Sequence, residues 1–416
     1  MGSAFLGLVA IVAGAFLLQV SNGWLGILVP LELGVEGYPA AVIGLVVTAH
    51  SVGFLVGCIF APRLVRSLGH IRAFAVLAAA VSVATMAFTA TVDPYLWGPL
   101  RLVTGFCSAG LFTIAESWIS AQTPSQFRGR VLSLYMLSNK VALAGGQLLL
   151  AFSNADASAY FLVAAACYSL SLIPVASTHG ATPSQPELMT LSLRKLYRIA
   201  PVGIVGAVAT GLVNGAVLGV APVYVVEIGQ SPAMAAILVA IMQSGSLVMQ
   251  WPLGWLSDRY ERRIVILIAS LVVAIVSAAI AFLGGTFPQA LYPLAVLWGG
   301  CALSIYALCL AHAGDFAEPH EMVPLASSLL LSWAAGAAAG PFMAAAFMEM
   351  VGPGGLFLYS AVIAAFLAGF VVWRMTRRAA PKPEDRERFV AMPVMTSPGS
   401  ARMDPRSPEA EGSGEA

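Results

Sequence analysis

The chain has 416 residues, of which 59% are apolar and only 10% are charged, and its mean hydropathy is +0.86. Soluble domains carry about 25% charged residues, so this composition excludes an ordinary soluble domain and predicts a polytopic membrane protein surrounded by lipid. The net charge of +1 argues against nucleic acid as a partner.

Continuous apolar runs of about 20 residues follow one another along the chain, as expected for membrane-spanning helices and unlike the alternating pattern of barrel strands. They predict an all-α membrane protein with twelve transmembrane helices in two pseudo-symmetric six-helix bundles. In chain order, the spans are expected at 4–31, 38–62, 73–91, 95–121, 131–152, 158–176, 200–226, 232–257, 264–283, 288–312, 325–348 and 355–373.

The Lys and Arg residues before the C-terminal tail lie almost entirely on one side of these spans. They fall in the breaks after spans 2, 4, 6, 8 and 12, whereas the opposite breaks contain acidic residues and no basic one. Cytoplasmic loops carry the Lys and Arg excess, so both termini are expected in the cytoplasm of a multi-pass plasma-membrane protein. In a bacterium, this membrane would be the inner one. The exceptions within the spans are Arg101 and Lys140.

The longest internal break, 177–199, contains two prolines and a basic stretch that looks amphipathic. We interpret it as a cytoplasmic loop that joins an N-terminal bundle, 1–176, to a C-terminal bundle, 200–373. The remaining residues, 374–416, are rich in Pro, Ser, Glu and Arg and have no apolar period, which predicts a disordered cytoplasmic tail.

A sequence repeat relates the two halves at a nearly constant offset. The Asn-Gly pair at 22–23 in span 1 matches the pair at 214–215 in span 7, and Gly53 in span 2 matches Gly245 in span 8. Paired interruptions in corresponding helices of two halves are typical of transporters whose binding site lies between the halves.

Two motifs resemble those of the major facilitator superfamily. Span 8 ends in a form of that family's loop signature, with Glu261 where a second glycine is usual, and Arg101-Leu-Val-Thr-Gly105 is similar to its span-4 motif. The first-half copy of the loop is degraded, since Arg66 stands opposite Asp258. The segments that resemble the YcaD-like branch are Ala115-Glu116-Ser117, Arg128-Gly-Arg130, Gly146-Gln147-Leu148, Gln250-Trp-Pro-Leu-Gly254 and Leu329-Leu-Leu-Ser332.

The resemblance implies alternating access, with two halves that rock about a midplane site, and a charged latch at the cytoplasmic face. Structural or gating use of these loop residues is expected rather than substrate contact. The predicted gating residues are Gly254, Asp258, Arg259, Arg262, Arg263, Arg128, Arg130 and Arg66.

Lys140 is the first candidate for a substrate or proton site, because it lies about nine residues into span 5, roughly 14 Å from the cytoplasmic edge. An ammonium at that depth should face an aqueous cavity or an anion, or form a structural ion pair. Glu116 in span 4 is its hypothesised partner and could carry protons, or could instead brace the Arg128 and Arg130 loop. Arg101 could tune a neighbour or bind an anion, or could extend to the outer interface.

Two histidines titrate near neutral pH and are further candidates, His50 in span 2 and His312 at the inner end of span 10. Helix packing is the alternative role for each. Uncharged polar or aromatic side chains could line a cavity or hydrogen-bond between helices. The candidates of this kind are Asn22, Asn214, Gln147, Gln243 and Tyr306.

Together these features predict a secondary transporter of a small organic solute, coupled to protons, with export slightly favoured. Import of a small organic anion is the alternative that Lys140 and Arg101 suggest, and a transporter-like sensor is a third. No nucleotide-binding signature, nucleophile–base grouping or metal-ligand spacing occurs, so we expect no enzymatic activity, cofactor or metal. The resemblance implies a monomer.

Overall fold

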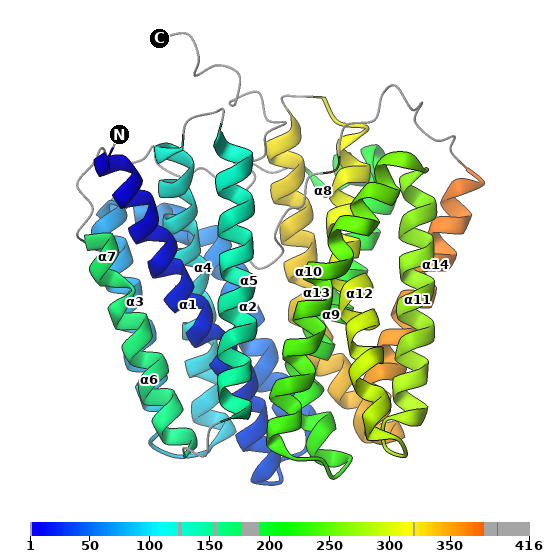
Figure 1. Cartoon of the computed structure of the whole chain (residues 1–416), viewed down its shortest axis with the longest axis horizontal. Helices are drawn as coiled ribbons and strands as arrows, with labels where there is room; N and C mark the ends of the chain where they lie inside the picture. Colours follow the sequence, from blue (N-terminus) through cyan, green and yellow to red (C-terminus); the bar gives the residue numbers. More distant parts are fainter. Residues whose placement is uncertain are drawn as a thin grey trace.

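A computed structural model describes residues 2–123, 127–152, 156–176, 191–318, 321–377 and 389. These residues form α-helices joined by short connections, with no strand among them (Figure 1). The helices are α1 Gly2–Val35, α2 Ala40–Leu68, α3 His70–Ala87, α4 Pro94–Gln122, α5 Arg128–Ala151, α6 Ala157–Leu170, α7 Leu172–Ala176, α8 Leu193–Ile199, α9 Pro201–Glu227, α10 Pro232–Arg259, α11 Arg262–Leu283, α12 Leu291–Gly314, α13 Met322–Val351 and α14 Gly355–Met375.

Each of the twelve predicted spans coincides with a helix, the sixth being α6 continued by α7. Among the described residues, eleven helical segments are long and apolar enough to cross a membrane, and α5 is not one of them. The lower apolarity of α5 comes from polar residues along its length, including Asn139, Lys140 and Gln147. The least apolar span is therefore the one with the intramembrane lysine.

The helix ends follow from local sequence. Asp93 precedes α4 and its carboxylate accepts a hydrogen bond of 3.0 Å from the Tyr95 amide, and Ser231 caps the start of α10 in the same way. Proline occupies the first position of both helices, where no intrahelical amide bond is lost. Gly69, with φ of 79°, separates α2 from α3 in a conformation that a side chain would oppose.

The helices form two bundles, α1–α7 and α9–α14, seen side by side in Figure 1. The sequence repeat has a direct structural counterpart. A Cβ on Gly23 of α1 would lie 2.7 Å from the Leu143 carbonyl oxygen of α5, and a Cβ on Gly215 of α9 would lie 2.6 Å from the Ala337 carbonyl oxygen of α13. Equivalent glycines thus permit equivalent close helix crossings in both bundles.

A second glycine pair repeats this relationship. A Cβ on Gly53 of α2 would lie 2.1 Å from the Leu102 carbonyl oxygen of α4, and a Cβ on Gly245 of α10 would lie 2.4 Å from the Val296 carbonyl oxygen of α12. Neither crossing has room for a side chain, so both halves depend on glycine at the same place.

The two bundles meet closely at the non-cytoplasmic ends of α2 and α13. Glu349 of α13 accepts a hydrogen bond of 2.9 Å from the amide of Ala41, in the first turn of α2. One turn further in, a Cβ on Gly44 would lie 2.6 Å from the Ala345 Cβ and 2.9 Å from the Pro341 carbonyl oxygen. The outer side is therefore closed where these helices meet.

Candidate functional site

A cavity of about 200 Å³ lies between the two bundles. Helices α1, α2, α4 and α5 line it from the N-terminal half, and α9, α10, α12 and α13 line it from the C-terminal half. Seven of the predicted pathway residues face it, namely Asn22, His50, Arg101, Lys140, Gln147, Asn214 and Gln243.

Lys140 connects the two bundles across this cavity. Its ammonium donates a hydrogen bond of 3.0 Å to Ser246 Oγ and one of 2.9 Å to Gln250 Oε1, both on α10. These two acceptors are one helical turn apart, so they present a single polar face to Lys140. Glu116, its hypothesised partner, instead accepts a bond of 3.3 Å from the Tyr135 hydroxyl.

Arg101 lines the same cavity from α4 and is only 4% exposed. Its Nε has no hydrogen-bond partner in the described structure. His50 of α2 packs against the same helix one turn away, with its Nδ1 3.4 Å from Thr104 Oγ1 on α4. Arg101 is thus buried at the cavity, and it does not extend to the outer interface.

The cavity has an unbalanced charge. Arg101 and Lys140 face it, and no described Asp or Glu residue is among the side chains that line it. The acceptors that Lys140 contacts are a hydroxyl and an amide, both neutral. Buried cations are stable when an anion accompanies them, so this arrangement can receive a negatively charged ligand.

Several buried polar atoms at the cavity lack a hydrogen-bond partner within the described structure. Buried polar groups are normally satisfied, and a cluster of exceptions indicates a place where a ligand or water binds. Besides Arg101 Nε, these atoms are both amide atoms of Asn139, Gln147 Oε1, Asn214 Oδ1 and Trp333 Nε1.

Asn22 is held in place by the N-terminal bundle. Its Oδ1 accepts hydrogen bonds of 2.8 Å from the Tyr168 hydroxyl and 3.2 Å from the Ser108 hydroxyl, and its amide donates one of 3.5 Å to Gln19 Oε1. Asn214, its counterpart in the repeat, donates one of 3.4 Å to the Ala302 carbonyl oxygen. The paired asparagines therefore occupy matching positions with different supports.

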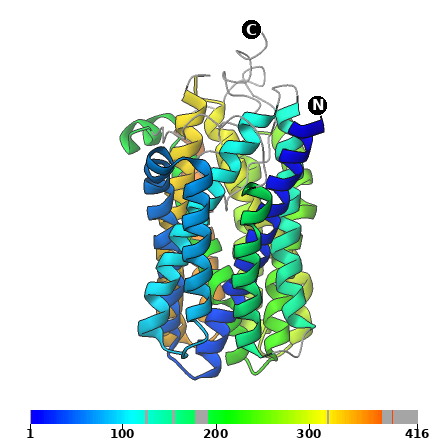
Figure 2. The same ribbon diagram turned by 90° about the vertical axis from the view of Figure 1, so that its left-hand side faces the viewer.

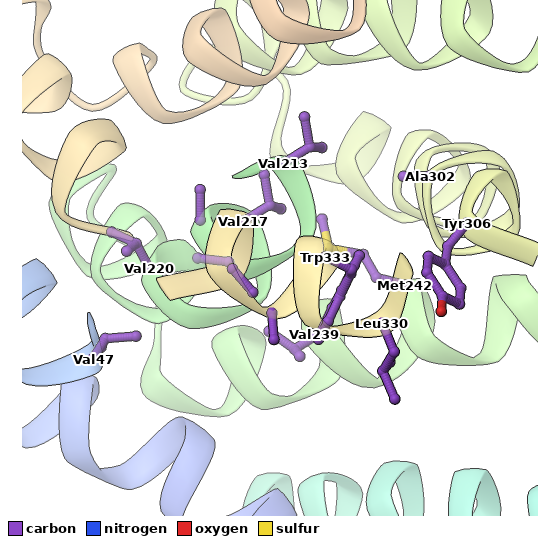
Figure 3. Packing of buried hydrophobic residues seen from close by; sticks show 14 of the residues in the cluster. Val47, Val213, Val217, Val220, Val239, Met242, Ala302, Tyr306, Leu330 and Trp333 are labelled. Atoms are coloured by element: carbon purple, nitrogen blue, oxygen red, sulfur yellow. The ribbon is translucent and has the colours of Figure 1, made fainter. Parts of the chain in front are cut away.

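Trp333 of α13 forms part of the cavity wall, and Figure 3 shows it among side chains of the C-terminal bundle with Tyr306 beside it. The two rings are 6.5 Å apart in an edge-to-face arrangement. Tyr306 is not among the lining residues, so it supports the wall from behind. Val47, labelled in the same view, comes from the N-terminal bundle and lies against α9, where a Cβ on Gly219 would be 2.6 Å from its Cγ1.

Two further predicted pathway residues lie away from the cavity wall. Glu116 is fully buried in α4, and His312 near the end of α12 packs its ring 5.2 Å from that of Phe316. Both side chains have partners in the structure. Neither residue lines the cavity between the bundles.

The predicted latch residues of the C-terminal half form a compact charged cluster. Arg262 is buried, donating a hydrogen bond of 2.8 Å from Nε to Asp315 Oδ2 and one of 3.1 Å to Ser257 Oγ, and it lies 3.9 Å from Asp258. Arg263 pairs with Glu261. These ion pairs join α10, α11 and the end of α12.

The remaining latch residues are arranged differently. Arg259 stacks 5.4 Å from the Trp255 ring, and Arg66 and Arg130 are exposed. The Arg128 side chain lies outside the described part. Asp258 accepts a bond of 2.8 Å from the Phe389 amide, and the Phe389 ring lies against Gly254, where a Cβ would meet it at 2.4 Å.

Ser246, Gln250 and Tyr168 were not among the predicted site residues. Gln243, Ser246 and Gln250 recur at three- and four-residue spacing, which puts them on one face of α10. That spacing was the available signal for a polar face. In the described residues, no group of three or more His, Cys, Asp or Glu side chains is placed to hold a metal ion.

The helical fold and the cavity between its two bundles define a multi-helix membrane transporter. The profile described as "Major Facilitator Superfamily" matches residues 11–227 and 203–405. The chain belongs to the major facilitator superfamily.

Curated relatives agree with this family. An MFS-type transporter of Yersinia pestis (strain Pestoides F) is 28% identical over 356 residues, which cover 85% of this chain and 92% of that protein. The MFS-type transporter YcaD of Salmonella dublin is 25% identical and covers the same shares. The resemblance to the YcaD-like branch is thereby confirmed.

Solved structures share the fold at low sequence identity. The nucleoside transporter NupG aligns with a TM-score of 0.73 at 13% identity, covering 89% of this chain and 99% of its own. A bacterial homologue of the human lysosomal transporter Spinster aligns with a TM-score of 0.72 at 15% identity, covering 92% and 98%. The twelve-helix, two-bundle architecture is that of known transporters.

Proposed function

We propose that this protein is a secondary transporter that moves a small organic anion across the plasma membrane by alternating access, with protons as the coupling ion. The observation that carries the substrate class is the cation pair, Arg101 and Lys140, at a cavity that no described carboxylate lines. The cavity volume of about 200 Å³ fits a small metabolite-sized solute better than a large one.

Electrostatics separates the possible substrates. A cationic solute would be repelled by two like charges in a poorly screened space, and a neutral solute would leave both charges uncompensated. An anion would form charge-assisted hydrogen bonds with Lys140 and Arg101, and Asn214 and Gln147 have free acceptor atoms for its hydroxyl or amine groups.

Alternating access is supported by the way the halves touch. The outer side is closed by Glu349 on Ala41 and by the tight packing at Gly44. Near the middle of the membrane, Lys140 holds α10 through neutral acceptors. A bound anion would compete with Ser246 and Gln250 for the ammonium, so substrate arrival would loosen the cross-bundle contact.

Glu116 is the proposed proton carrier. It is the fully buried carboxyl of α4, bonded to Tyr135 of α5, and α5 also contains Lys140. Protonation would remove a buried charge beside the helix pair that faces the substrate. The proton gradient can then drive either import or export, and direction is read from the experiment below.

The test is flux in proteoliposomes containing the purified full chain, with a pH gradient imposed in each direction. The labelled panel comprises a monocarboxylate, a dicarboxylate, a neutral sugar, a nucleoside and an organic amine. We expect saturable, gradient-dependent flux of an anion. Preferential flux of the amine or of a neutral solute would refute the anion assignment, and binding without flux would favour a sensor.

A further inference from the structure

A second basic site lies at the cytoplasmic boundary, away from the central cavity. It is a groove lined by three cations of α8, namely Arg194, Lys195 and Arg198, and by Arg374 of α14. The other lining residues are Ser192 and Tyr197, so no described acidic side chain lines the groove.

The helix that supplies three of these cations lies at the edge of the membrane. Figure 2 shows α8 projecting sideways from the bundle at the level of the cytoplasmic helix ends. The chain turns at Ala200 into α9, the next membrane span. This position places the groove beside the head groups of the cytoplasmic leaflet.

α8 is amphipathic in the sense that membrane surfaces require. Leu196 is fully buried against the protein, whereas Leu193 is 68% exposed and Tyr197 is 46% exposed. Exposed leucine and tyrosine beside arginines fit the boundary between acyl chains and head groups.

The partner element carries a matching feature. Arg374 stacks 5.4 Å from the Trp373 ring, and this tryptophan is 46% exposed on the outside of α14. Tryptophan at the end of a span marks the head-group level. Two helices far apart in sequence, α8 and α14, thus bring arginine and an aromatic ring to the same depth. The general excess of basic residues in cytoplasmic loops would not by itself produce this arrangement.

The groove is anchored to the C-terminal bundle. Lys195 pairs with Glu321 at the start of α13, and the Leu191 amide donates a hydrogen bond of 2.8 Å to Ser328 Oγ of α13. Arg194 and Arg198 are both exposed at the protein surface. The cations available to a ligand are therefore the three arginines.

We propose that this groove is a binding site for the phosphate head group of an anionic phospholipid in the cytoplasmic leaflet. Arginine binds phosphate oxygens through paired hydrogen bonds, and basic pockets beside transmembrane helices suit anionic lipids. Because α8 and α13 are joined through Lys195 and Glu321, the bound lipid would hold the inter-bundle segment against the C-terminal bundle. The site is independent of the proposed transport substrate.

The test is titration of the detergent-purified full chain with phosphatidylglycerol, phosphatidylcholine or inorganic phosphate, followed by native mass spectrometry. Wild type should retain phosphatidylglycerol in preference to phosphatidylcholine. The double variant Arg194→Gln/Arg198→Gln should bind phosphatidylglycerol roughly tenfold more weakly. The matched control is Arg63→Gln/Arg72→Gln, which removes two exposed arginines from another cytoplasmic break and should bind as wild type does.

A charge-preserving variant distinguishes the loss of positive charge from misfolding. Arg194→Lys/Arg198→Lys should keep most of the preference for phosphatidylglycerol, because the cations remain. Equal binding of phosphatidylglycerol by wild type and the glutamine variant would overturn the proposal. Inorganic phosphate that displaces the lipid at micromolar concentration would also overturn it, since the groove would then be a free-phosphate site.

Discussion

The ammonium of Lys140 lies 2.9 Å from Gln250 Oε1, and this hydrogen bond crosses from the N-terminal to the C-terminal bundle. A neutral amide satisfies the geometry of the lysine without neutralising its charge. An anion in the cavity would therefore compete with the amide for Lys140, and the strength of this competition is measurable.

Gln250→Leu should increase affinity for the transported anion by about tenfold. The substitution removes one competing acceptor, and a hydrogen bond to a charged group contributes about 1.5–3 kcal/mol. The measurement is equilibrium binding of the labelled anion by the purified protein. Trp251→Phe, on the lipid-exposed side of the same helix, is the control and should not change affinity. Weaker binding by Gln250→Leu would mean that Gln250 contacts the substrate itself.

Lys140→Gln and Arg101→Gln should each lower anion affinity by about 30-fold or more, because each removes one charge-assisted contact of about 2 kcal/mol. Lys140→Arg and Arg101→Lys should retain part of the wild-type anion affinity, because the positive charge remains. The measurement is competition between the labelled anion and unlabelled analogues. If a neutral analogue of the same shape loses as much affinity as the anion, then the cations act through cavity shape.

Glu349→Ala should move the protein toward a state that is open on the outer side. The bond from the Ala41 amide to Glu349 caps the first turn of α2, and such a contact contributes about 1 kcal/mol. The population ratio should then change by about fivefold. The measurement is labelling of Leu218→Cys at the cavity by an impermeant thiol reagent added outside, in a background without native cysteines.

The control for this outer contact is Glu36→Ala, which removes an exposed acid from the neighbouring outer loop. It should not alter labelling. Gly44→Val should act in the same direction as Glu349→Ala and more strongly, because its side chain cannot fit against Pro341 and Ala345. Unchanged labelling in both variants would show that the closed outer contact does not limit opening.

Glu116→Gln should abolish the stimulation of flux by a pH gradient while leaving equilibrium anion binding within about twofold, because Glu116 is not at the cavity wall. Tyr135→Phe should reduce the stimulation in part. The measurement is initial flux with and without the imposed gradient. Intact stimulation in Glu116→Gln would assign the proton to a different group, with His50 the next to test.

Asp315→Asn should destabilise the cytoplasmic end of the C-terminal bundle by about 3 kcal/mol. The variant leaves the buried Arg262 without its closest carboxylate, at 2.8 Å, and breaking one side of a buried ion pair typically costs about 3–5 kcal/mol. The measurement is thermal unfolding in detergent. Glu318→Gln, in the same loop, is the comparison and should have a smaller effect.

The order of the spans was predictable from sequence because the length of an apolar run follows from the thickness of the bilayer. Seven cavity residues were also predictable, because charged and amide side chains within spans are costly in lipid and therefore face the protein interior or a cavity. The repeat that relates Gly23 to Gly215 was visible in the sequence, whereas the close helix crossing at each of these glycines is seen only in the structure.

The pairing of side chains was not predictable. Lys140 and Glu116 have similar depths on consecutive spans, so sequence order favoured their contact, yet Lys140 bonds to α10 from the other bundle. The sequence indicates the depth of a residue within its span. It does not indicate the rotation of the packed helix about its axis, which decides the neighbour that the side chain faces. Tyr306 illustrates the same point, since it lies one turn from the cavity-lining Leu303 and packs behind the wall against Trp333.

The low apolarity of α5 has a consequence for biogenesis. A helix with Lys140 and several amides partitions less well into lipid than its neighbours, and among the described spans α5 is the least apolar. Its close crossing with α1, where the Leu143 carbonyl meets Gly23, offers a protein surface in place of acyl chains. We therefore expect α5 to insert stably only when α1 is already in the bilayer to pack against it, so that the helix with the proposed substrate lysine depends on an earlier helix of the same chain.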